Sequence, residues 1–257
     1  MKNLVSLYLL LSFSPTVMAQ LLPVGSGIYR WSDLTIKAEP QRESRKLLEG
    51  TTPEFEYFEI HATTQHKGAV SRPAHTQNSL EELIIIKEGT MKCTVGEKTR
   101  ILGKGSVLLI PPLQEQHFEN IGDGPLTYYV FMFRSRKPMD LERSKKAGGA
   151  LLLNHDSLRY TETGTKGTRK FFERPTAMCE NFEMHITTLK QKGPSHAPHQ
   201  HLDSEIILMI EGSSEMIIDG KLYPGSAGDL YVVESGKMHG ISNTSEKPCS
   251  YFAFRWR

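Results

Sequence analysis

The chain contains an internal repeat. The segment FEIHATT, which starts at Phe58, recurs as FEMHITT from Phe182, 124 residues later. The segment EELIIIKEG around Glu82 recurs as SEIILMIEG around Glu205, 123 residues later. Matched blocks that follow each other in the same order at nearly the same spacing indicate a tandem duplication. The sequence therefore predicts two units of the same fold.

Each unit reads as a series of short β-strands. Apolar or alternating runs are separated by turn signals such as EGT, VGEK, IDGK and GDGP, which is typical of an all-β sandwich or barrel. The units close on similar aromatic segments, YYVFMFR ending at Arg134 and SYFAFR ending at Arg255. Helix-like sequence is confined to residues around 40–50 and 138–158, and the second of these separates the two units.

The N-terminus has the layout of a secretory signal peptide. One lysine precedes an apolar run at residues 4–13, which is followed by Pro15 and by the pattern Val-Met-Ala that ends at Ala19. The apolar run is about half of the roughly 20 residues that a membrane-spanning helix needs, which argues against a membrane anchor. We expect cleavage after Ala19, a mature chain that starts at Gln20, a secreted or periplasmic location, and no membrane span after signal removal.

The charge balance argues against a dedicated nucleic-acid surface. The 31 lysines and arginines stand against 29 acidic residues, which gives a net charge of +2, and nucleic-acid binding needs a clustered basic patch. The basic run RSRKPMDLERSKK is interpreted as a solvated linker. We therefore expect no nucleic-acid partner.

Three cysteines are too few for a disulfide framework. A single bond between Cys179 and Cys249 is compatible with an oxidising compartment. In the internal repeat these two cysteines align with Phe55 and Leu126, which favours small buried apolar side chains instead. Both interpretations stay open at this point.

The segment PHQHLDSEIILMIEG places metal-binding side chains on one face of a strand. His199 and His201 share a parity, and Glu205 can rejoin them after the break at LDS. Neutral imidazole and carboxylate together suit a divalent transition metal: manganese, iron, nickel, cobalt or zinc. The pattern predicts a metal site in the second unit.

The second unit resembles the cupin superfamily. The first motif of that family is matched by Gly193, His199, His201, Glu205 and Gly212, with every spacing met. The second motif is matched by Gly228, Gly236, His239 and Asn243, with Glu234 in place of its proline. The resemblance implies that His239 is the fourth metal ligand and that the fold is two tandem cupin, jelly-roll-like β-barrels with few short helices, a bicupin.

The first unit matches the same motifs less well. Its ligand positions fall on His75, Gln77, Glu82 and His117, and Gln77 stands where the family has a histidine. One extra residue also separates Pro111 from His117. An amide oxygen is a weaker ligand than imidazole for first-row metals. We expect a second, weaker metal site or a structural remnant here.

Residues beside the ligands are candidates for a supporting role. The strand FEMHITT puts Glu183, His185 and Thr187 on one face, so His185 can orient a ligand or the substrate. A polar outer face or a contact between the units is the alternative for that face. Tyr231, next to the second motif, is a further candidate, although strand parity does not place it inside the barrel.

The sequence therefore gives four segments and two functional hypotheses. The segments are the signal peptide (1–19), an N-terminal cupin domain with a weak metal site (20–137), a linker and entry segment (138–171) and a C-terminal cupin domain (172–257). Since bicupins perform many reactions, the fold does not select the chemistry. We expect a metal-dependent enzyme that acts on a small polar molecule, or alternatively a non-catalytic module that binds such a molecule. A homodimer is left open.

Overall fold

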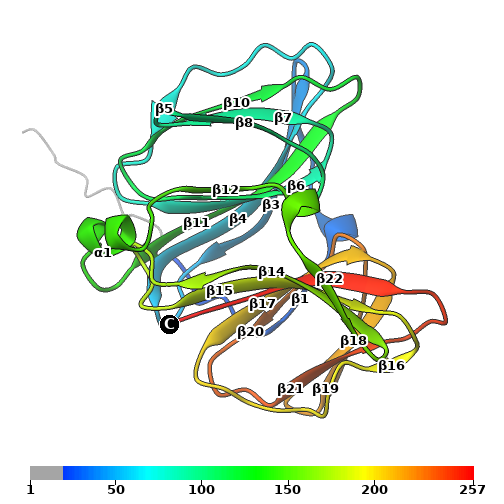
Figure 1. The fold of residues 1–257 in the computed structure, drawn as a ribbon. Coiled ribbons are helices and arrows are strands. Elements are labelled where there is room, and N and C mark those ends of the chain that lie inside the picture. Colours follow the sequence, from blue (N-terminus) through cyan, green and yellow to red (C-terminus); the bar gives the residue numbers. More distant parts are fainter. Residues whose placement is uncertain (1–19) are drawn as a thin grey trace, which may run out of the picture.

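The computed structural model describes residues 20–257, which form two stacked β-domains (Figure 1). The expected signal peptide, residues 1–19, lies outside the described residues. The helices in the described part are α1 (Leu141–Lys146) and the 3-10 turns η1 (Trp31–Asp33) and η2 (His155–Ser157). None of them is long and apolar enough to cross a membrane.

The first half consists of two antiparallel sheets. The larger sheet contains, in spatial order, β12 (Leu151–Leu153), β9 (Val107–Ile110), β6 (Glu81–Glu88), β11 (Leu126–Ser135), β4 (Phe55–Gln65), β3 (Arg42–Gly50) and β2 (Lys37–Glu39). The smaller sheet contains β5 (His75–Thr76), β10 (Glu115–Asn120), β7 (Met91–Val95) and β8 (Lys98–Leu102).

The second half repeats this arrangement strand for strand. Its larger sheet contains, in spatial order, β1 (Gly27–Tyr29), β20 (Leu230–Val233), β17 (Ser204–Glu211), β22 (Cys249–Trp256), β15 (Phe182–Leu189), β14 (Lys166–Arg174) and β13 (Tyr160–Thr163). The smaller sheet contains β16 (Gly193–Pro194), β21 (His239–Asn243), β18 (Ser213–Ile218) and β19 (Lys221–Ser226). The predicted duplication and all-β class are confirmed, although each half is a pair of sheets rather than a closed barrel.

The two halves exchange one short strand each. β1 lies at the start of the described chain but pairs with β20, with Gly27 opposite Val232. β12 follows the first half in sequence and pairs back onto its β9, with Leu151 opposite Leu109. The segments expected from the sequence, 20–137 and 138–171, do not anticipate this exchange, because β1 and β12 each pair with the half to which the sequence did not assign them. In addition, β13 and the start of β14 extend the second sheet ahead of residue 172.

The larger sheets of the two halves pack against each other through a shared apolar core. On β6, Leu83 and Ile85 belong to this central cluster, whereas Ile84 and Ile86 belong to a separate cluster inside the first half. Such a strand is buried on both faces, which explains its continuous apolar sequence. Aromatic rings from both halves meet in the centre, where Phe131 and Phe254 lie edge to face with centroids 5.0 Å apart.

Residues 42–50 form strand β3, so the expectation of helix-like structure there is wrong. The sequence RESRKLLEG is rich in good helix formers, but β3 pairs with β4 on one side and with β2 on the other. A register shift between Lys46 and Leu48 buries both Leu47 and Leu48. Tertiary pairing and burial therefore outweigh a weak local propensity. The other helix-like stretch does contain α1.

Two sequence details have a direct structural reading. Gly212 has φ of +79°, and a Cβ atom there would lie 2.5 Å from the carbonyl oxygen of Pro248. Only glycine fits such a position without strain, which accounts for the turn after β17. Cys93, Cys179 and Cys249 are buried free thiols, so the bond between Cys179 and Cys249 is not formed.

Candidate metal centre

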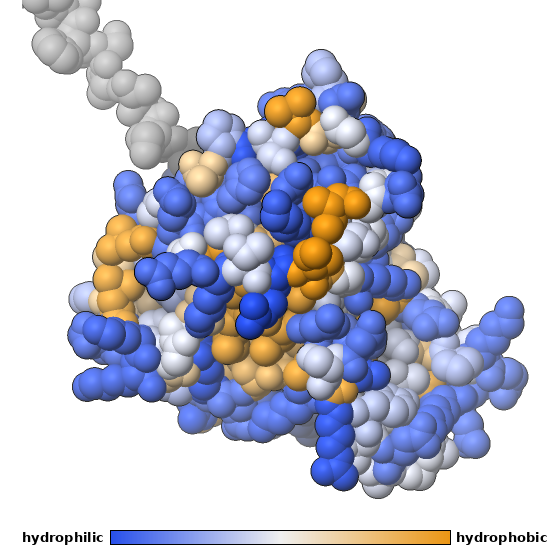
Figure 2. Space-filling view, turned by 45° about the horizontal axis from the view of Figure 1, so that its top comes forward, coloured by the Kyte–Doolittle hydropathy of each residue, from blue (hydrophilic) through white to orange (hydrophobic). Residues whose placement is uncertain are grey.

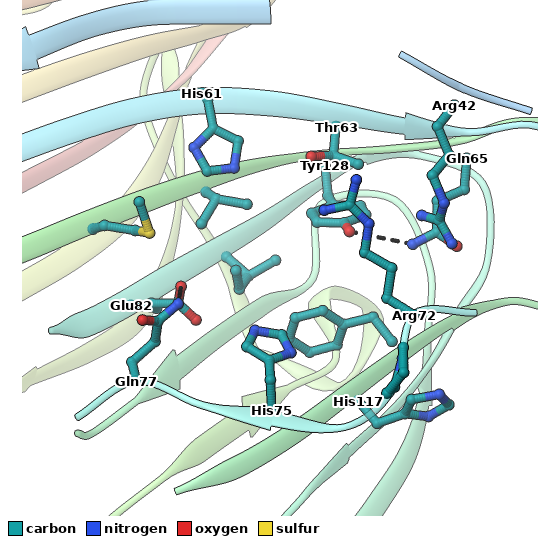
Figure 3. A pocket seen from close by; sticks show the side chains of 15 residues that line it. Arg42, His61, Thr63, Gln65, Arg72, His75, Gln77, Glu82, His117 and Tyr128 are labelled. Atoms are coloured by element: carbon teal, nitrogen blue, oxygen red, sulfur yellow. Dashed lines mark hydrogen bonds between the residues drawn. The ribbon is translucent and has the colours of Figure 1, made fainter. Parts of the chain in front are cut away.

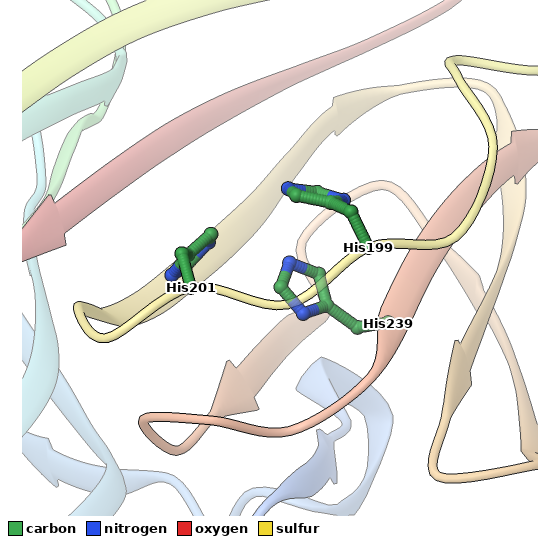
Figure 4. Close-up of side chains that lie close together, drawn as sticks. All are labelled: His199, His201 and His239. Atoms are coloured by element: carbon green, nitrogen blue, oxygen red, sulfur yellow. The ribbon is translucent and has the colours of Figure 1, made fainter.

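Three histidines of the second half lie side by side at one end of its smaller sheet (Figure 4). His199 and His201 lie on the segment that leads into β17, and His239 is the first residue of β21. The backbones of His199 and His239 form an isolated β-bridge, in which each N–H donates to the other residue's carbonyl at 2.9 and 2.8 Å. This bridge fixes the separation of two side chains from distant parts of the sequence.

The ring nitrogens and the Glu205 carboxylate converge on a small volume. One ligand atom from each of the three histidines lies within 4.8 Å of the others. Oε2 of Glu205 lies 3.2 Å from Nε2 of His201 and 3.0 Å from Nε2 of His239. Two ligand atoms bound at about 2.1 Å to one ion at right angles would be about 3.0 Å apart. The observed spacings therefore match those of neighbouring metal ligands.

Backbone carbonyls orient two of the imidazole rings. Nδ1 of His201 donates to the carbonyl of Asp203, and Nδ1 of His239 donates to the carbonyl of Lys237, both at 2.8 Å. A proton held on Nδ1 leaves the Nε2 lone pair free for a metal. Nδ1 of His199 is buried without a hydrogen-bond partner among residues 20–257. Lone pairs and a carboxylate that face one another fit an intervening cation.

The electrostatics of this cluster favour charged Glu205 and neutral His199. Burial alone raises the pKa of Glu205, but in the metal-free protein hydrogen bonds from protonated Nε2 atoms of His201 and His239 outweigh it and lower this pKa to about 2. A bound metal takes the place of these Nε2 protons. Burial, followed by the nearby imidazoles, lowers the pKa of His199. The hydrogen bond to Glu205 raises the pKa of His201. An ionised carboxylate and a neutral imidazole are the forms that bind metal.

A cavity of about 250 Å³ lies directly beside this cluster. His185 lines it, so the polar face of β15 turns inward rather than toward solvent or the other half. Nδ1 of His185 lies 3.3 Å from Oε1 of Glu183, whose other oxygen accepts from Nε of Arg255 at 2.8 Å. Tyr231 does not line the cavity: it is fully buried in the core, and its hydroxyl hydrogen-bonds to Ser214 at 2.9 Å.

Sequence reasoning missed two cationic residues of this cavity. Lys166 and Arg255 both line it. In the sequence Arg255 only ends the repeated aromatic segment, whereas the pairing of β22 with β17 puts it directly opposite Glu205. Lys166 begins β14 and falls within residues 138–171, which the sequence assigns to the linker and entry segment. Both charges face the space next to the histidines.

In the first half, the structure brings together His75, Gln77 and Glu82 but puts Gln116, rather than His117, in the fourth position. Gln116 is opposite His75 in the register of β10 and β5, as His239 is opposite His199. It lies 123 residues before His239, the same spacing as that between Glu82 and Glu205. The extra residue inferred before His117 is therefore absent, and the His117 ring points away from the other three residues (Figure 3).

The two glutamines satisfy this cluster internally. Nε2 of Gln77 donates to Oε1 of Glu82 at 3.1 Å, and Nε2 of Gln116 donates to Oε2 of Glu82. Nε2 of Gln116 also lies 3.3 Å from Nε2 of His75. Amide N–H groups thus bond to the Glu82 carboxylate in the first half. In the second half the corresponding positions carry imidazoles, whose lone pairs point to one place. Burial raises the pKa of Glu82, although the Gln116 hydrogen bond opposes the rise.

Comparisons with known proteins agree with this architecture. L-ectoine synthase of Saccharophagus degradans is 34% identical over 67 residues, which are 25% of this chain and 50% of that protein. The chain thus spans about half the length of this curated relative. AerE from Microcystis aeruginosa superposes with a TM-score of 0.67 at 12% identity and covers 87% of this chain and 97% of its own.

Two further solved structures show the same two-unit fold. Oxalate decarboxylase from Lactobacillus farciminis has a TM-score of 0.69 at 10% identity, over 91% of this chain and 87% of its own. YlbA from E. coli has a TM-score of 0.67 at 15% identity, over 96% and 98%. The cupin domain family matches residues 62–132 and 185–255, which together exceed half of the chain. With one match in each half, the chain belongs to the cupin superfamily and is a bicupin.

Proposed function

We propose that the second half binds one divalent transition metal ion through His199, His201, Glu205 and His239. The observation that carries the proposal is the convergence of two Nε2 atoms on one carboxylate oxygen, at 3.2 and 3.0 Å, with both Nδ1 atoms tied to carbonyls. Manganese, iron, nickel, cobalt and zinc all accept this nitrogen and oxygen donor set. The first half, with its two amides, holds no ion tightly.

We further propose that the chain is a metal-dependent enzyme acting on a small polar molecule. When bound, the metal supplies Lewis acidity or an activated ligand at its open positions. The cavity of about 250 Å³ limits the substrate to a small molecule, and Lys166 offers positive charge for a polar group, whereas the charge of Arg255 is paired with Glu183. L-ectoine synthase and oxalate decarboxylase are enzymes by name, which supports an enzyme over a binding module.

His185 is the group best placed to hold or move a proton in this cavity. Its Nδ1 faces the Glu183 carboxylate, which leaves Nε2 as the site that exchanges a proton with a bound molecule. The hydrogen bond with His185 and, after the opposing effect of burial, that with Arg255 lower the pKa of Glu183 to about 2. Glu183 therefore stays ionised and orients the imidazole at neutral pH.

Elemental analysis of purified variants tests the metal site. After dialysis against a weak chelator, we expect about one metal equivalent per chain in the wild type and nearly none in His201→Ala. The matched control is Gln77→Ala, the equivalent change in the first half, which should retain the ion. Two tightly held equivalents in the wild type, or loss of metal from Gln77→Ala, would contradict the assignment of the ion to the second half.

Turnover assays separate an enzyme from a binding module. The metal-loaded wild type is screened on small polar substrates such as sugar acids, diketones and ureido acids, with His185→Gln as the variant that keeps the cavity filled. A substrate that the wild type converts, with a reduced rate but retained metal in His185→Gln, supports the proposed role. Saturable binding without conversion across the screen would favour the non-catalytic alternative.

A further inference from the structure

The first half has a cavity of its own, of about 230 Å³ (Figure 3). His75, Gln77 and Glu82 lie at one end of it, and Arg42, Gln65, Arg72 and Tyr128 gather at the other end. The volume is equal to roughly eight water molecules at about 30 Å³ each, which is enough for a short organic molecule. Apolar side chains of Ile84, Val130 and Met132 form part of the cavity wall.

The end with Glu82 offers little to a cation. Both carboxylate oxygens of Glu82 accept amide N–H groups, and the same Gln116 amide reaches His75. A carboxylate that accepts one hydrogen bond on each oxygen has about half of its acceptor sites in use. Because the Glu82 charge is already bonded to two amides, this end has no positive charge to attract an anion, and the arginines supply that charge at the other end.

The opposite end carries two guanidinium groups without a strong acidic partner. Arg42 forms no ion pair among residues 20–257, and its Nη2 donates to the carbonyl of Val70. Arg72 pairs with Glu39 at 3.1 Å, but the two side chains are 68% and 42% exposed. An ion pair as exposed as this one is weak and screened by salt. Positive charge at this end thus remains available to an anion.

Neutral polar groups between the arginines complete this end. Nε2 of Gln65 donates to the Tyr128 hydroxyl at 3.2 Å, as the dashed line in Figure 3 shows. Oε1 of Gln65 is buried without a partner among residues 20–257, but as an acceptor it cannot bind a carboxylate and is left for a donor group of a ligand. Burial raises the pKa of Tyr128, whereas the Gln65 hydrogen bond and the charges of Arg42 and Arg72 lower it. The Tyr128 hydroxyl accepts from Gln65 and keeps its own proton to donate.

We propose that this cavity binds a small organic carboxylate without any metal, with the carboxylate held by Arg42, Arg72 and the Tyr128 hydroxyl. Guanidinium groups match carboxylates in charge and geometry, and such hydrogen bonds are among the strongest in proteins. The aliphatic part of the ligand lies against Ile84, Val130 and Met132. This site is separate from the metal centre of the second half, so its existence does not depend on the proposed enzyme activity.

Calorimetric titration with chosen acids tests the site. The probes are butanoate and succinate, with butanamide as an uncharged match for butanoate, and the full-length mature chain is kept free of metal by a chelator. We expect saturable binding of at least one acid with one site per chain, weaker binding as ionic strength rises, and no binding of butanamide. Absence of saturable binding by both acids, or equal binding of butanamide, would overturn the proposal.

Substitutions in the two cavities test whether the organic acid binds in the first half. Arg42→Gln and Arg72→Gln should each weaken binding by about tenfold or more, because each removes a charge-assisted hydrogen bond. Tyr128→Phe, which removes only the hydroxyl, should weaken it severalfold. The matched control is Lys166→Gln, since Lys166 lies 124 residues after Arg42 and lines the other cavity. Loss of binding in Lys166→Gln with retention in Arg42→Gln would place the anion in the second half and refute the proposal.

Discussion

Glu81 couples the stability of the protein to pH at the contact between the two halves. Its side chain is fully buried, and its Oε2 accepts hydrogen bonds from Oγ1 of Thr176 at 2.7 Å and from the backbone N–H of Met178 at 2.9 Å. Oε1 has no partner among residues 20–257. Burial raises the pKa of Glu81 from 4.5 to about 7, although the Thr176 and Met178 hydrogen bonds oppose the rise.

The sign of the effect follows from the two protonation states. Below pH 4.5 the carboxyl is protonated in both the folded and the unfolded chain, so the folded state pays no ionisation penalty. Between pH 4.5 and about 7 the unfolded chain loses the proton while the folded chain keeps it, and stability falls as pH rises. A rise in pKa from 4.5 to about 7 corresponds to about 3 kcal/mol, since each pH unit counts for about 1.4 kcal/mol.

The perturbation is Glu81→Gln, which keeps the shape of the side chain and removes its titration. We expect the free energy of unfolding of the variant, relative to the wild type, to increase by about 3 kcal/mol between pH 4.5 and pH 8. Urea unfolding followed by tryptophan fluorescence measures this, because Trp256 is buried at the same contact. Chelator in all samples excludes an effect of bound metal.

A second variant gives the direction of the shift an independent test. Thr176→Val removes a hydrogen bond that lowers the pKa of Glu81, so the loss of stability should extend to higher pH than in the wild type. Parallel stability curves for the wild type and Glu81→Gln across pH 4.5–8 would refute the reasoning, because they would mean that Glu81 ionises equally easily in both states.

Three further predictions concern the repeat and the N-terminus. The double change Gln77→His and Gln116→His should create a second three-histidine set and raise the metal content from about one to about two equivalents; an unchanged content would show that more than these ligands differs. Gly212→Ala should lower the free energy of unfolding by about 2–5 kcal/mol, whereas Gly220→Ala, also at positive φ but in open space, should cost about 1 kcal/mol; equal losses in urea unfolding would contradict the steric argument. Mass spectrometry of protein from the native host should find Gln20 at the mature N-terminus, and a product that retains Met1 would contradict export.

Much of the architecture could be predicted because both the repeat and the alternation of apolar and polar residues along the strands can be recognised in the sequence. The faces of the strands could not be assigned so simply. His185 shares a face with Glu183, but β15 belongs to a sheet that is buried on both sides, one against the other half and one against the cavity. Alternation alone identifies two faces and does not say which of them is inside.

The error at His117 has a different cause. Matching by residue type selected a histidine, whereas the constant spacing of 123 residues selects Gln116 and also relates Asn120 to Asn243. The two asparagines make equivalent bonds, from Nδ2 to the carbonyls of Gly124 and Lys247, and this agrees with the pairing of Gln116 with His75 and of His239 with His199. A shift of one residue on a strand turns the side chain to the opposite face. The spacing of the repeat therefore identifies the residue equivalent to His239 more reliably than the residue type does.

The exchange of β1 and β12 indicates how the duplicated chain arose. Each copy of the repeat donates its first strand to the sheet of the other copy, with β1 on β20 and β12 on β9. This is the arrangement of a dimer in which two identical subunits swap their N-terminal arms, now joined into one polypeptide. A gene that encoded one arm-swapping subunit would give this protein after fusion in tandem. Once fused, the copies no longer had to stay identical, and they now differ at two ligand positions, where Gln77 and Gln116 correspond to His201 and His239.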